Sequence, residues 1–316
     1  MAWRAYKIVL RLRSPLHIGR GKVGNLQRTR PYVAGRNLWG ALTARLTRDA
    51  DADGKPDPKE YQKMGKRVHE ELAFTYFFPT TEALDYAPLF PRLTEQGAWG
   101  YGQNGDGAPR LDAATFGYRF LSTYAGTALN YDVSSVEEAS LHEVECLLPH
   151  TRAARDAGLA SEPVYLTGYL FQREASTLDW RSALTRLQIG GERGYGWGHV
   201  TVAAITEIEE VAPRPVPLFE TGHTVDLAGE AVRVRLRAGR PLLAHALAAD
   251  FSAERRAVPA QIRGPVTPLV GRETTPETRF GVHLSQARVC YAPGARAQTA
   301  GEAIIGPYGV WEGVGE

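Results

Sequence analysis

The segment whose residue types are best suited to binding an anion is GGERGYGWGH, Gly190 to His199. Glycine lets backbone N–H groups approach an anion closely, and arginine forms paired hydrogen bonds with phosphate. The glycine spacing fits neither of the two common nucleotide-phosphate motifs, both of which follow a strand and open a helix. An anion at this loop would instead be held by loop amides and by Arg193.

The elements around this loop run in the opposite order. Upstream, Trp180, Leu184 and Leu187 recur at helical spacing in LDWRSALTRLQ. Downstream, HVTVAAITEIEEV has a period of two, as in a strand. The loop is therefore predicted to connect the end of a helix to the start of a strand.

The first 48 residues carry a strong positive charge. They contain eleven Lys or Arg and no acid before Asp49, whereas acids outnumber bases in the rest of the chain. Within them, Tyr6, Ile8, Leu10 and Leu12 predict one face of a strand, with Lys7, Arg11 and Arg13 on the other. A basic glycine-containing loop, 19–30, separates this strand from a helix marked by Leu38, Leu42 and Leu46. This asymmetry favours a polyanion as the partner of the first segment.

Composition narrows the class of protein. The 316 residues are 43% hydrophobic and 23% charged, with two cysteines, Cys146 and Cys290. Two cysteines are too few for a disulfide framework or a cysteine-rich zinc site, so we expect buried thiols, no metal and no cofactor. No apolar run reaches 18 residues, and the first residues alternate in polarity. We therefore expect a cytoplasmic protein with no membrane partner.

The remaining pattern predicts two α+β units. A second amphipathic helix is expected near 58–75, and a Gly-, Pro- and aromatic-rich insertion near 76–135. The first unit spans 1–211, a proline-rich linker 212–230, and a smaller second unit 231–316. AVRVRLRAGRPLL, from Ala231, repeats the pattern of IVLRLRSPLHIG, which indicates a weak internal repeat.

Four motifs in order resemble the RAMP superfamily, the repeat-associated proteins of CRISPR effector complexes. They are SPLHIGRGK, PYVAGRNLWGALTARL, ASLHEVECLL and IGGERGYGWGHV. Gly35, Leu38, Gly40, Ala41 and Leu42 match the family's helix-start motif, and the glycines from Gly190 to Gly198 match its C-terminal loop. Within the superfamily the pattern is most similar to type III subunits, especially the III-D-type subunit that caps the crRNA 5′ handle.

The resemblance implies a ferredoxin-like (RRM-like) α+β fold with a long insertion, followed by a smaller, degenerate ferredoxin-like unit. It implies binding of the crRNA 5′ handle, indirect contact with target RNA, and partners that include the large subunit and the backbone subunits. Arginines would bind phosphates, and Tyr195 and Trp197 would stack on bases or pack in the core. The expected RNA-binding residues are His17, Arg20, Lys22, Arg28, Arg30, Arg36, Asn37, Gly190, Gly191, Arg193, Gly194, Tyr195, Gly196, Trp197 and Gly198.

Catalysis is the open question at this stage. Some relatives cut RNA with a histidine, and type III backbone subunits cut target RNA with an aspartate. His17 and His199 could exchange protons near neutral pH, and Asp106 and Asp112 lie in the glycine-rich insertion. We favour a non-catalytic subunit. The alternatives are a backbone subunit that cleaves target RNA, and a stand-alone, metal-independent crRNA-processing endoribonuclease.

Overall fold

The computed structural model describes residues 2–51, 57–83, 87–104, 108–154, 158–208, 215–252, 254–275 and 280–313. Most of its regular structure is strand. The described α-helices are α1 (Gly35–Ala50), α2 (Pro58–Glu71), α3 (Ala113–Phe120) and α4 (Trp180–Leu184). The mixed α+β composition expected from the sequence is confirmed. Among the described residues, no helix combines the length and apolarity needed to span a membrane.

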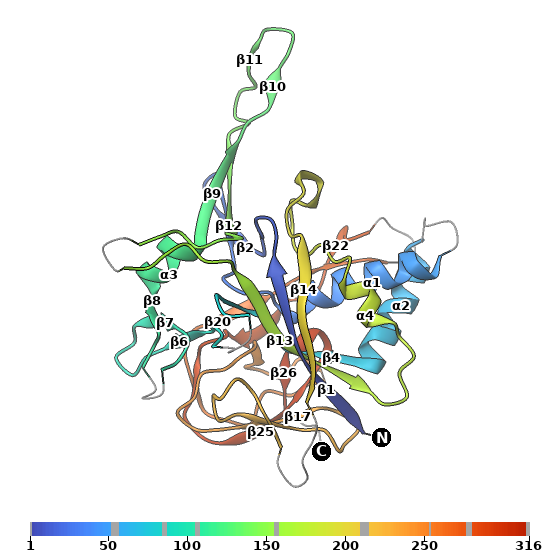
Figure 1. Cartoon of the computed structure of the whole chain (residues 1–316). Coiled ribbons are helices and arrows are strands. Elements are labelled where there is room, and N and C mark those ends of the chain that lie inside the picture. The colour runs from blue at the N-terminus through green and yellow to red at the C-terminus, as the bar shows by residue number, and fades with distance from the viewer. Residues whose placement is uncertain are drawn as a thin grey trace.

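A central antiparallel sheet lies between two layers (Figure 1). Its strands are β1 (Trp3–Leu12), β13 (Tyr165–Arg173), β14 (Val200–Ile208), β4 (Leu72–Phe74) and β5 (Phe78–Thr80). Their order is β14-β1-β13-β4, with β5 also pairing with β13. The long alternating apolar runs of β1 and β13 are paired over nine positions, which places these two strands at the centre of the fold.

Helices cover one face of this sheet. The residues on one face of β1, among them Ile8, Leu10 and Leu12, are buried in the same cluster as Leu38, Leu42 and Trp180 of α1 and α4. The apolar side chains of α1 recur every four residues, so they form one stripe that faces the sheet. Complete burial of each such leucine stabilises the fold by about 1.5–3 kcal/mol.

The other face of the central sheet is also buried. Trp3, Ala5, Tyr169 and Phe171 share a second core with the C-terminal part of the chain. Lys7, expected on a polar face, is half-buried there, and burial lowers its pKa to about 8. The alternation of β1 is therefore correct, but its second face packs against protein rather than water. Both faces of the two central strands, β1 and β13, are therefore covered and offer no platform for stacking nucleobases.

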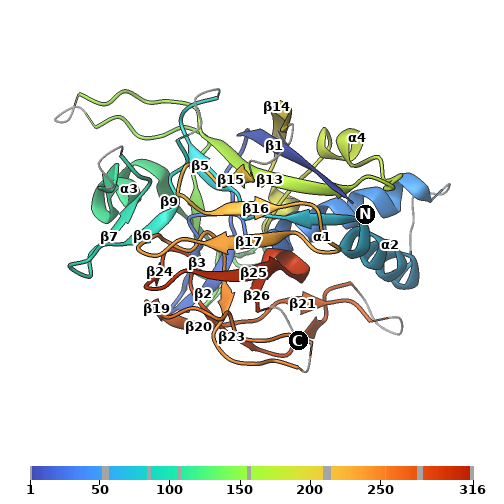
Figure 2. The same cartoon turned by 90° about the horizontal axis from the view of Figure 1, so that it is seen from below.

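The C-terminal part forms an eight-stranded sheet in the order β15-β16-β17-β25-β26-β18-β23-β20 (Figure 2). Its strands are β15 (Val216–Pro217), β16 (Thr224–Asp226), β17 (Arg233–Leu236), β18 (Ala246–Leu247), β20 (Val266–Leu269), β23 (Arg288–Tyr291), β25 (Gly301–Ile305) and β26 (Trp311–Glu312). Two-stranded sheets join β19 (Ile262–Arg263) to β24 (Arg296–Ala297), and β21 (Arg272–Glu273) to β22 (His283–Leu284).

This region differs from the α+β unit and the linker predicted from the sequence. Among its described residues the only helical segment is the 3-10 turn η3 (Pro307–Gly309). Its apolar residues come in short alternating runs broken by Gly and Pro, which suit strands and lack a helical stripe. Described residues 215–230 of the expected linker contribute β15 and β16, because Val216, Leu218 and Val225 are buried in the second core.

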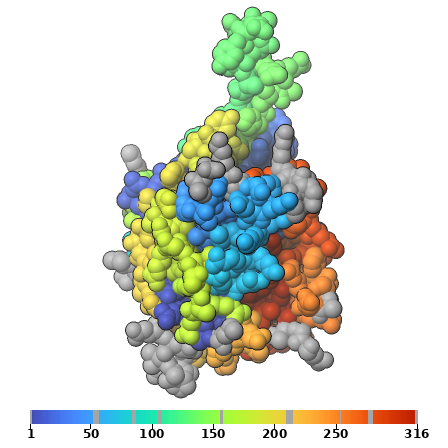
Figure 3. Space-filling view, turned by 90° about the vertical axis from the view of Figure 1, so that its right-hand side faces the viewer, coloured from blue at the N-terminus to red at the C-terminus, as the bar shows by residue number. Residues whose placement is uncertain are grey.

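A long projecting hairpin begins within the predicted insertion and ends beyond it. β6 (Pro91–Leu93), β7 (Trp99–Tyr101) and β8 (Leu111–Asp112) form a small sheet that leads into α3. β9 (Leu121–Gly126) and β12 (His142–Leu147) then pair, with β10 (Leu129–Asn130) and β11 (Ser135–Val136) beyond them. We call residues 121–147 the arm. It stands clear of the body in Figures 1 and 3.

The base of the arm belongs to a second small sheet. Its order is β2-β3-β12-β9, where β2 (Gly19–Val23) and β3 (Leu26–Thr29) form the hairpin of the predicted basic loop. β12 pairs in parallel with β3 and antiparallel with β9. The basic N-terminal segment and the arm, which are far apart in the sequence, therefore lie side by side.

Candidate nucleic-acid interface

The glycine-rich loop rests on the turn that follows β1. The Gly191 N–H donates to the His17 carbonyl at 2.9 Å, and the Gly198 N–H donates to the Pro15 carbonyl at 2.7 Å. The His199 N–H donates to Ser14 Oγ at 2.9 Å. These bonds join the loop to the start of the β2–β3 hairpin, so two segments predicted to meet a polyanion lie together.

Two of the glycines are fixed by sterics. Gly190 has a φ of +85°, and a Cβ there would lie 2.3 Å from the His17 carbonyl oxygen. Gly198 has a φ of +78°, and its Cβ would lie 1.8 Å from the Ile189 carbonyl oxygen. No side chain fits at either position. A Cβ on Gly194 or Gly196, in contrast, would meet nothing within 4 Å, although Gly196 also has a positive φ of +79°.

The tip of the loop presents its polar and aromatic groups to solvent. The 3-10 turn η2 (Arg193–Tyr195) leaves Arg193 exposed and Tyr195 81% exposed. Gln188 Nε2 donates to the carbonyls of Arg193 and Trp197, at 3.0 and 2.9 Å, and so holds the tip in shape. Trp197 is half-buried, and its ring meets Tyr124 of the arm edge-on at 5.2 Å.

The basic hairpin contributes two kinds of side chain. Arg20 and Lys22 lie on β2, whose residues are all exposed. Arg28 forms an ion pair with Glu145 of β12 at 3.0 Å, and Arg30 Nη1 donates to the Tyr32 hydroxyl at 3.4 Å. Burial raises the pKa of Tyr32, partly offset by the Arg30 charge, so Arg30 faces a neutral hydroxyl. Arg20 and Lys22 thus face solvent, while Arg28 and Arg30 also hold the hairpin to the body.

His17 lies beneath the loop rather than on its surface. It is 6% exposed, and its Nδ1–H donates to the Glu145 carbonyl at 2.7 Å. The Glu145 carboxylate accepts from the Thr29 N–H at 2.8 Å as well as from Arg28. His17 and Glu145 therefore connect the glycine loop, the hairpin and the arm in one buried network.

Two predicted RNA contacts lie elsewhere. Arg36, in the first turn of α1, donates to the Arg272 carbonyl at 2.9 Å and to Glu273 at 3.3 Å. Its guanidinium also lies over the Tyr308 ring, 4.4 Å from the centroid. Asn37, the next residue, is half-buried. Arg36 thus belongs to a cleft against the C-terminal part, and its sequence neighbourhood gave no sign of that distant partner.

The candidate aspartates have different positions. Asp112 caps α3: its Oδ1 accepts from the Thr115 N–H at 2.8 Å and its Oδ2 from the Thr115 hydroxyl at 2.6 Å. The Thr115 hydroxyl, followed by its N–H, lowers the pKa of Asp112. Asp112 is an ionised helix cap. Asp106 lies outside the described residues.

The sequence pointed to neither Tyr124 nor Glu145 as part of this surface. Tyr124 is 48% exposed on β9 and reaches Trp197 only because the arm folds beside the loop. Glu145 is an acid between the buried apolar residues Val144 and Cys146 of β12, and such a buried charge is a sign of a specific partner. The sequence shows this acid among apolar residues, but it does not show which residues are its partners.

Comparison with known proteins shows a likeness in fold to one solved structure. No family model matches the chain, and no curated protein matches it. A solved structure of the Type III-B Cmr-beta, bound to cognate target RNA and AMPPnP, contains a chain with a TM-score of 0.52. The match covers 92% of this chain and 86% of that chain at 11% sequence identity. The two chains share a fold.

Two other structures of Cmr-beta match less well. The complex bound to cognate target RNA gives a TM-score of 0.47 at 11% identity, covering 92% of this chain and 86% of that chain. The apo state gives 0.38 at 12% identity, covering 65% of this chain and 98% of that chain. TM-scores below 0.5 do not establish a shared fold, so the likeness in fold rests on the first structure.

Proposed function

We propose that this chain is a crRNA-binding subunit of a type III CRISPR RNA-guided interference complex. In this role it holds the repeat-derived 5′ handle and contacts the large subunit and the first backbone subunit. The observation that carries the proposal is the docking of the glycine loop on His17, directly before the basic β2–β3 hairpin. The likeness in fold to a chain of the Type III-B Cmr-beta supports it.

The order of elements supports a ferredoxin-like unit within residues 1–211. α1 and α2 lie between β1 and β4, and α4 lies between β13 and β14. The sheet order β14-β1-β13-β4 is the order 4-1-3-2 of a split β-α-β pair. In this arrangement the loop after α4 and the turn after β1 emerge at the same end of the sheet, where we place the RNA.

RNA binding is assigned to loops because both faces of β1 and β13 are covered. Arg193, Arg20 and Lys22 offer exposed positive charge for phosphates, and Tyr195 offers an exposed ring for a base. Each stacked base contributes about 1–3 kcal/mol with little dependence on its identity. Exposed charge together with an exposed ring suits a single-stranded segment such as a handle.

The arm tip is assigned to a protein partner rather than to RNA. Residues 127–141 contain three acids and no Lys or Arg, so this segment would repel phosphates. Tyr131 is 85% exposed and Val133 66% exposed. Exposed apolar side chains on a projecting hairpin are typical of a subunit contact. A neighbouring subunit with an apolar groove and basic rim fits this chemistry.

The role we propose is non-catalytic. His17 is buried and donates its Nδ1–H to a carbonyl, and Asp112 is engaged as a helix cap. A general acid or base needs access to the proton that it transfers. We therefore give both residues structural roles, and we favour neither the target-cleaving backbone subunit nor the stand-alone processing enzyme.

Purification from cells that express the complex tests this function. RNA and proteins that co-purify with the tagged chain are sequenced and identified. We expect crRNAs that share a repeat-derived 5′ end, together with a large subunit and backbone subunits. Recovery of the chain without such RNA would contradict the proposal. Metal-independent cutting of repeat RNA by the chain alone would instead support the processing enzyme.

A further inference from the structure

A second cationic site is a cleft of about 890 Å³ between the helices and the C-terminal part, lined by no residue of the glycine loop or of the β2–β3 hairpin. Binding sites for small molecules usually span about 300–1,000 Å³. Five basic side chains line this cleft, Arg36, Lys66, Arg255, Arg272 and Arg288, against three carboxylates, Glu70, Glu254 and Glu273. The cleft therefore has the size of a ligand site and an excess of positive charge.

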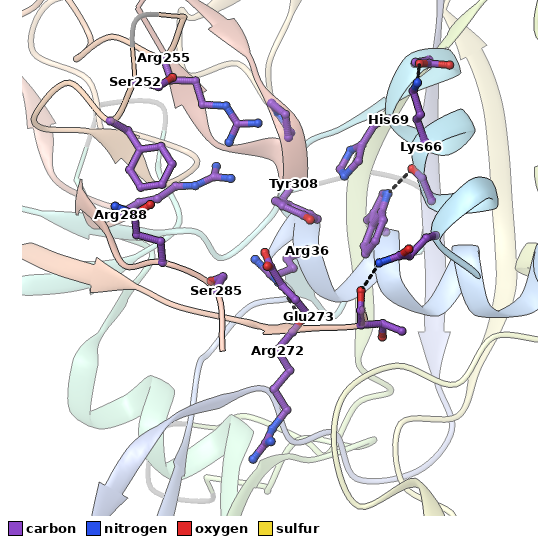
Figure 4. Close-up of a pocket in the computed structure, with 18 of the residues that line it drawn as sticks. Arg36, Lys66, His69, Ser252, Arg255, Arg272, Glu273, Ser285, Arg288 and Tyr308 are labelled. Carbon is purple, nitrogen blue, oxygen red and sulfur yellow. Dashed lines mark hydrogen bonds and ion pairs between the residues drawn. The ribbon is translucent and has the colours of Figure 1, made fainter. Parts of the chain in front are cut away.

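Two guanidiniums converge within the cleft. Figure 4 shows Arg255 and Arg288 pointing toward Tyr308, with His69 of α2 on the far side and Arg272 pointing away. Arg288 lies 3.4 Å from the buried Glu312 carboxylate, and Arg255 lies 4.0 Å from it. In the part of the chain that the structure describes, no other carboxylate lies within 4.0 Å of either guanidinium. The Glu312 carboxylate is thus shared by both guanidiniums.

Of the two arginines, Arg255 has more N–H donors available for a ligand. Its side chain is 29% exposed and donates no hydrogen bond of normal length to any residue that the structure describes. A guanidinium carries five N–H donors in a fork that matches phosphate oxygens. Burial, followed by the charges of Arg255, Arg288 and Arg36, lowers the pKa of the neighbouring His69 to about 4. His69 is therefore a neutral hydrogen-bonding group in a positive field.

An aromatic wall completes the cleft. Trp39, Tyr61, Phe251 and Tyr308 line it together with the arginines. Tyr308 has a left-handed φ of 65°, a strained conformation for a residue other than glycine. Its ring meets His69 edge-on at 4.6 Å, and His69 stacks on Trp39 at 4.7 Å. The wall is held rigidly beside the two guanidiniums.

We propose that this cleft binds a nucleotide, with its phosphate at Arg255 and Arg288 and its base against the aromatic wall. Phosphate matches the guanidinium forks, and a flat base matches the wall and the size of the cleft. The same chemistry is available from a free nucleotide and from the 5′-phosphorylated end of an RNA. We assign the free nucleotide, because none of the residues that line the cleft belongs to the glycine loop or to the β2–β3 hairpin.

Titration calorimetry on the full chain at about 0.15 M salt tests this site. The probes are ADP, adenosine, inorganic phosphate, and a short oligonucleotide with a 5′-phosphate or a 5′-hydroxyl. We expect saturable ADP binding, and binding of adenosine and phosphate that is at least about tenfold weaker, a loss of about 1.4 kcal/mol. Binding of the 5′-phosphorylated oligonucleotide without ADP would overturn the free nucleotide in favour of an RNA end.

Arg255→Ala is the decisive variant, and Arg256→Ala is its matched control. Arg256 is the adjacent arginine, does not line the cleft, and forms an exposed ion pair with Asp250 at 2.9 Å. We expect Arg255→Ala to weaken ADP binding at least about tenfold and Arg256→Ala to change it less than about twofold. Equal affinities of the two variants, or no saturable binding of any phosphorylated probe to the parent, would refute the site.

Discussion

The Gly191 N–H donates to the carbonyl of His17 at 2.9 Å, and this hydrogen bond joins the glycine loop to the basic N-terminal segment. The same carbonyl lies 2.3 Å from the position that a Cβ on Gly190 would occupy. The loop can therefore approach His17 only where its backbone carries no side chain. Its glycines consequently divide into those that seat the loop and those that leave its tip open.

Gly190→Ala should lose stability, whereas Gly194→Ala should not. The first change places a methyl group against a backbone carbonyl at a positive φ, which should cost about 1–3 kcal/mol or more. The second adds a methyl group in open space and should stay within about 0.5 kcal/mol. Urea unfolding of both variants measures the difference. Equal losses would show that the loop is not seated on His17.

Removing Arg20 and Lys22 together should weaken RNA binding without loss of fold. Each lost phosphate contact should reduce the slope of log affinity against log salt by about 0.7 for single-stranded RNA. Fluorescence anisotropy with repeat-derived RNA at several salt concentrations measures this slope. The control is Arg233→Ala with Arg235→Ala, two exposed, ion-paired arginines on β17. A similar change in both double variants would remove β2 from the interface.

Cleavage of target RNA by the assembled complex should survive Asp112→Ala and His17→Asn. Asp112 serves as a helix cap and His17 as a buried hydrogen-bond donor, so their loss should appear in stability rather than in chemistry. Loss of the cap should cost about 0.5–2 kcal/mol. Gel analysis of every cleavage position is the measurement. Disappearance of one position from an intact complex would make the residue catalytic.

Stability should fall as the pH drops from about 6.5 toward 4. Burial, followed by the charge of Arg240, lowers the pKa of His223 to about 4, although the hydrogen bond that its Nε2–H donates to the Pro241 carbonyl opposes this shift. Its Nδ1 accepts from the Arg237 N–H, as a neutral imidazole can. Between these pH values the unfolded chain binds the proton and the folded chain does not. The free energy of unfolding should therefore fall by up to about 1.4 kcal/mol per pH unit for this histidine.

His223→Asn should make this dependence shallower, because the variant has no imidazole to protonate at that position. The exposed His199 supplies the control, and His199→Asn should leave the slope unchanged. Urea midpoints from pH 4 to 7 measure both variants. If the parent and His223→Asn gave parallel curves, the burial of a neutral imidazole would not be the source of the slope.

The sequence correctly predicted the elements that have a local hydrophobic period. The alternation of β1, the leucine stripe of α1 and the helix-loop-strand order around Gly190–Gly198 were all visible as patterns. It could not predict that the second face of β1 packs against the C-terminal strands, since alternation does not reveal what covers a face. The helices expected after residue 231 were inferred from a weak repeat whose short runs suit strands.

For the candidate site, the sequence showed which residue types are present, but it did not show which residues pair with one another. Arg20, Lys22 and Arg28 look alike in the sequence, yet only Arg28 has a buried carboxylate beside it, contributed by Glu145 from 117 positions away. Arg36 was expected among the RNA-binding residues. Its partners, Glu273 and Tyr308, come from the other end of the chain. Long-range pairings of this kind leave no local pattern.

Ultraviolet crosslinking followed by mass spectrometry, on the complex with its co-purified crRNA, tests the central claim most directly. It reports which residues of this chain touch which nucleotides. Our account predicts crosslinks from the hairpin 19–30 and from Tyr195 or Trp197 to the repeat-derived 5′ end of the guide. A chain that crosslinks to that end only through other surfaces, or only to the spacer-derived part of the guide, would contradict it.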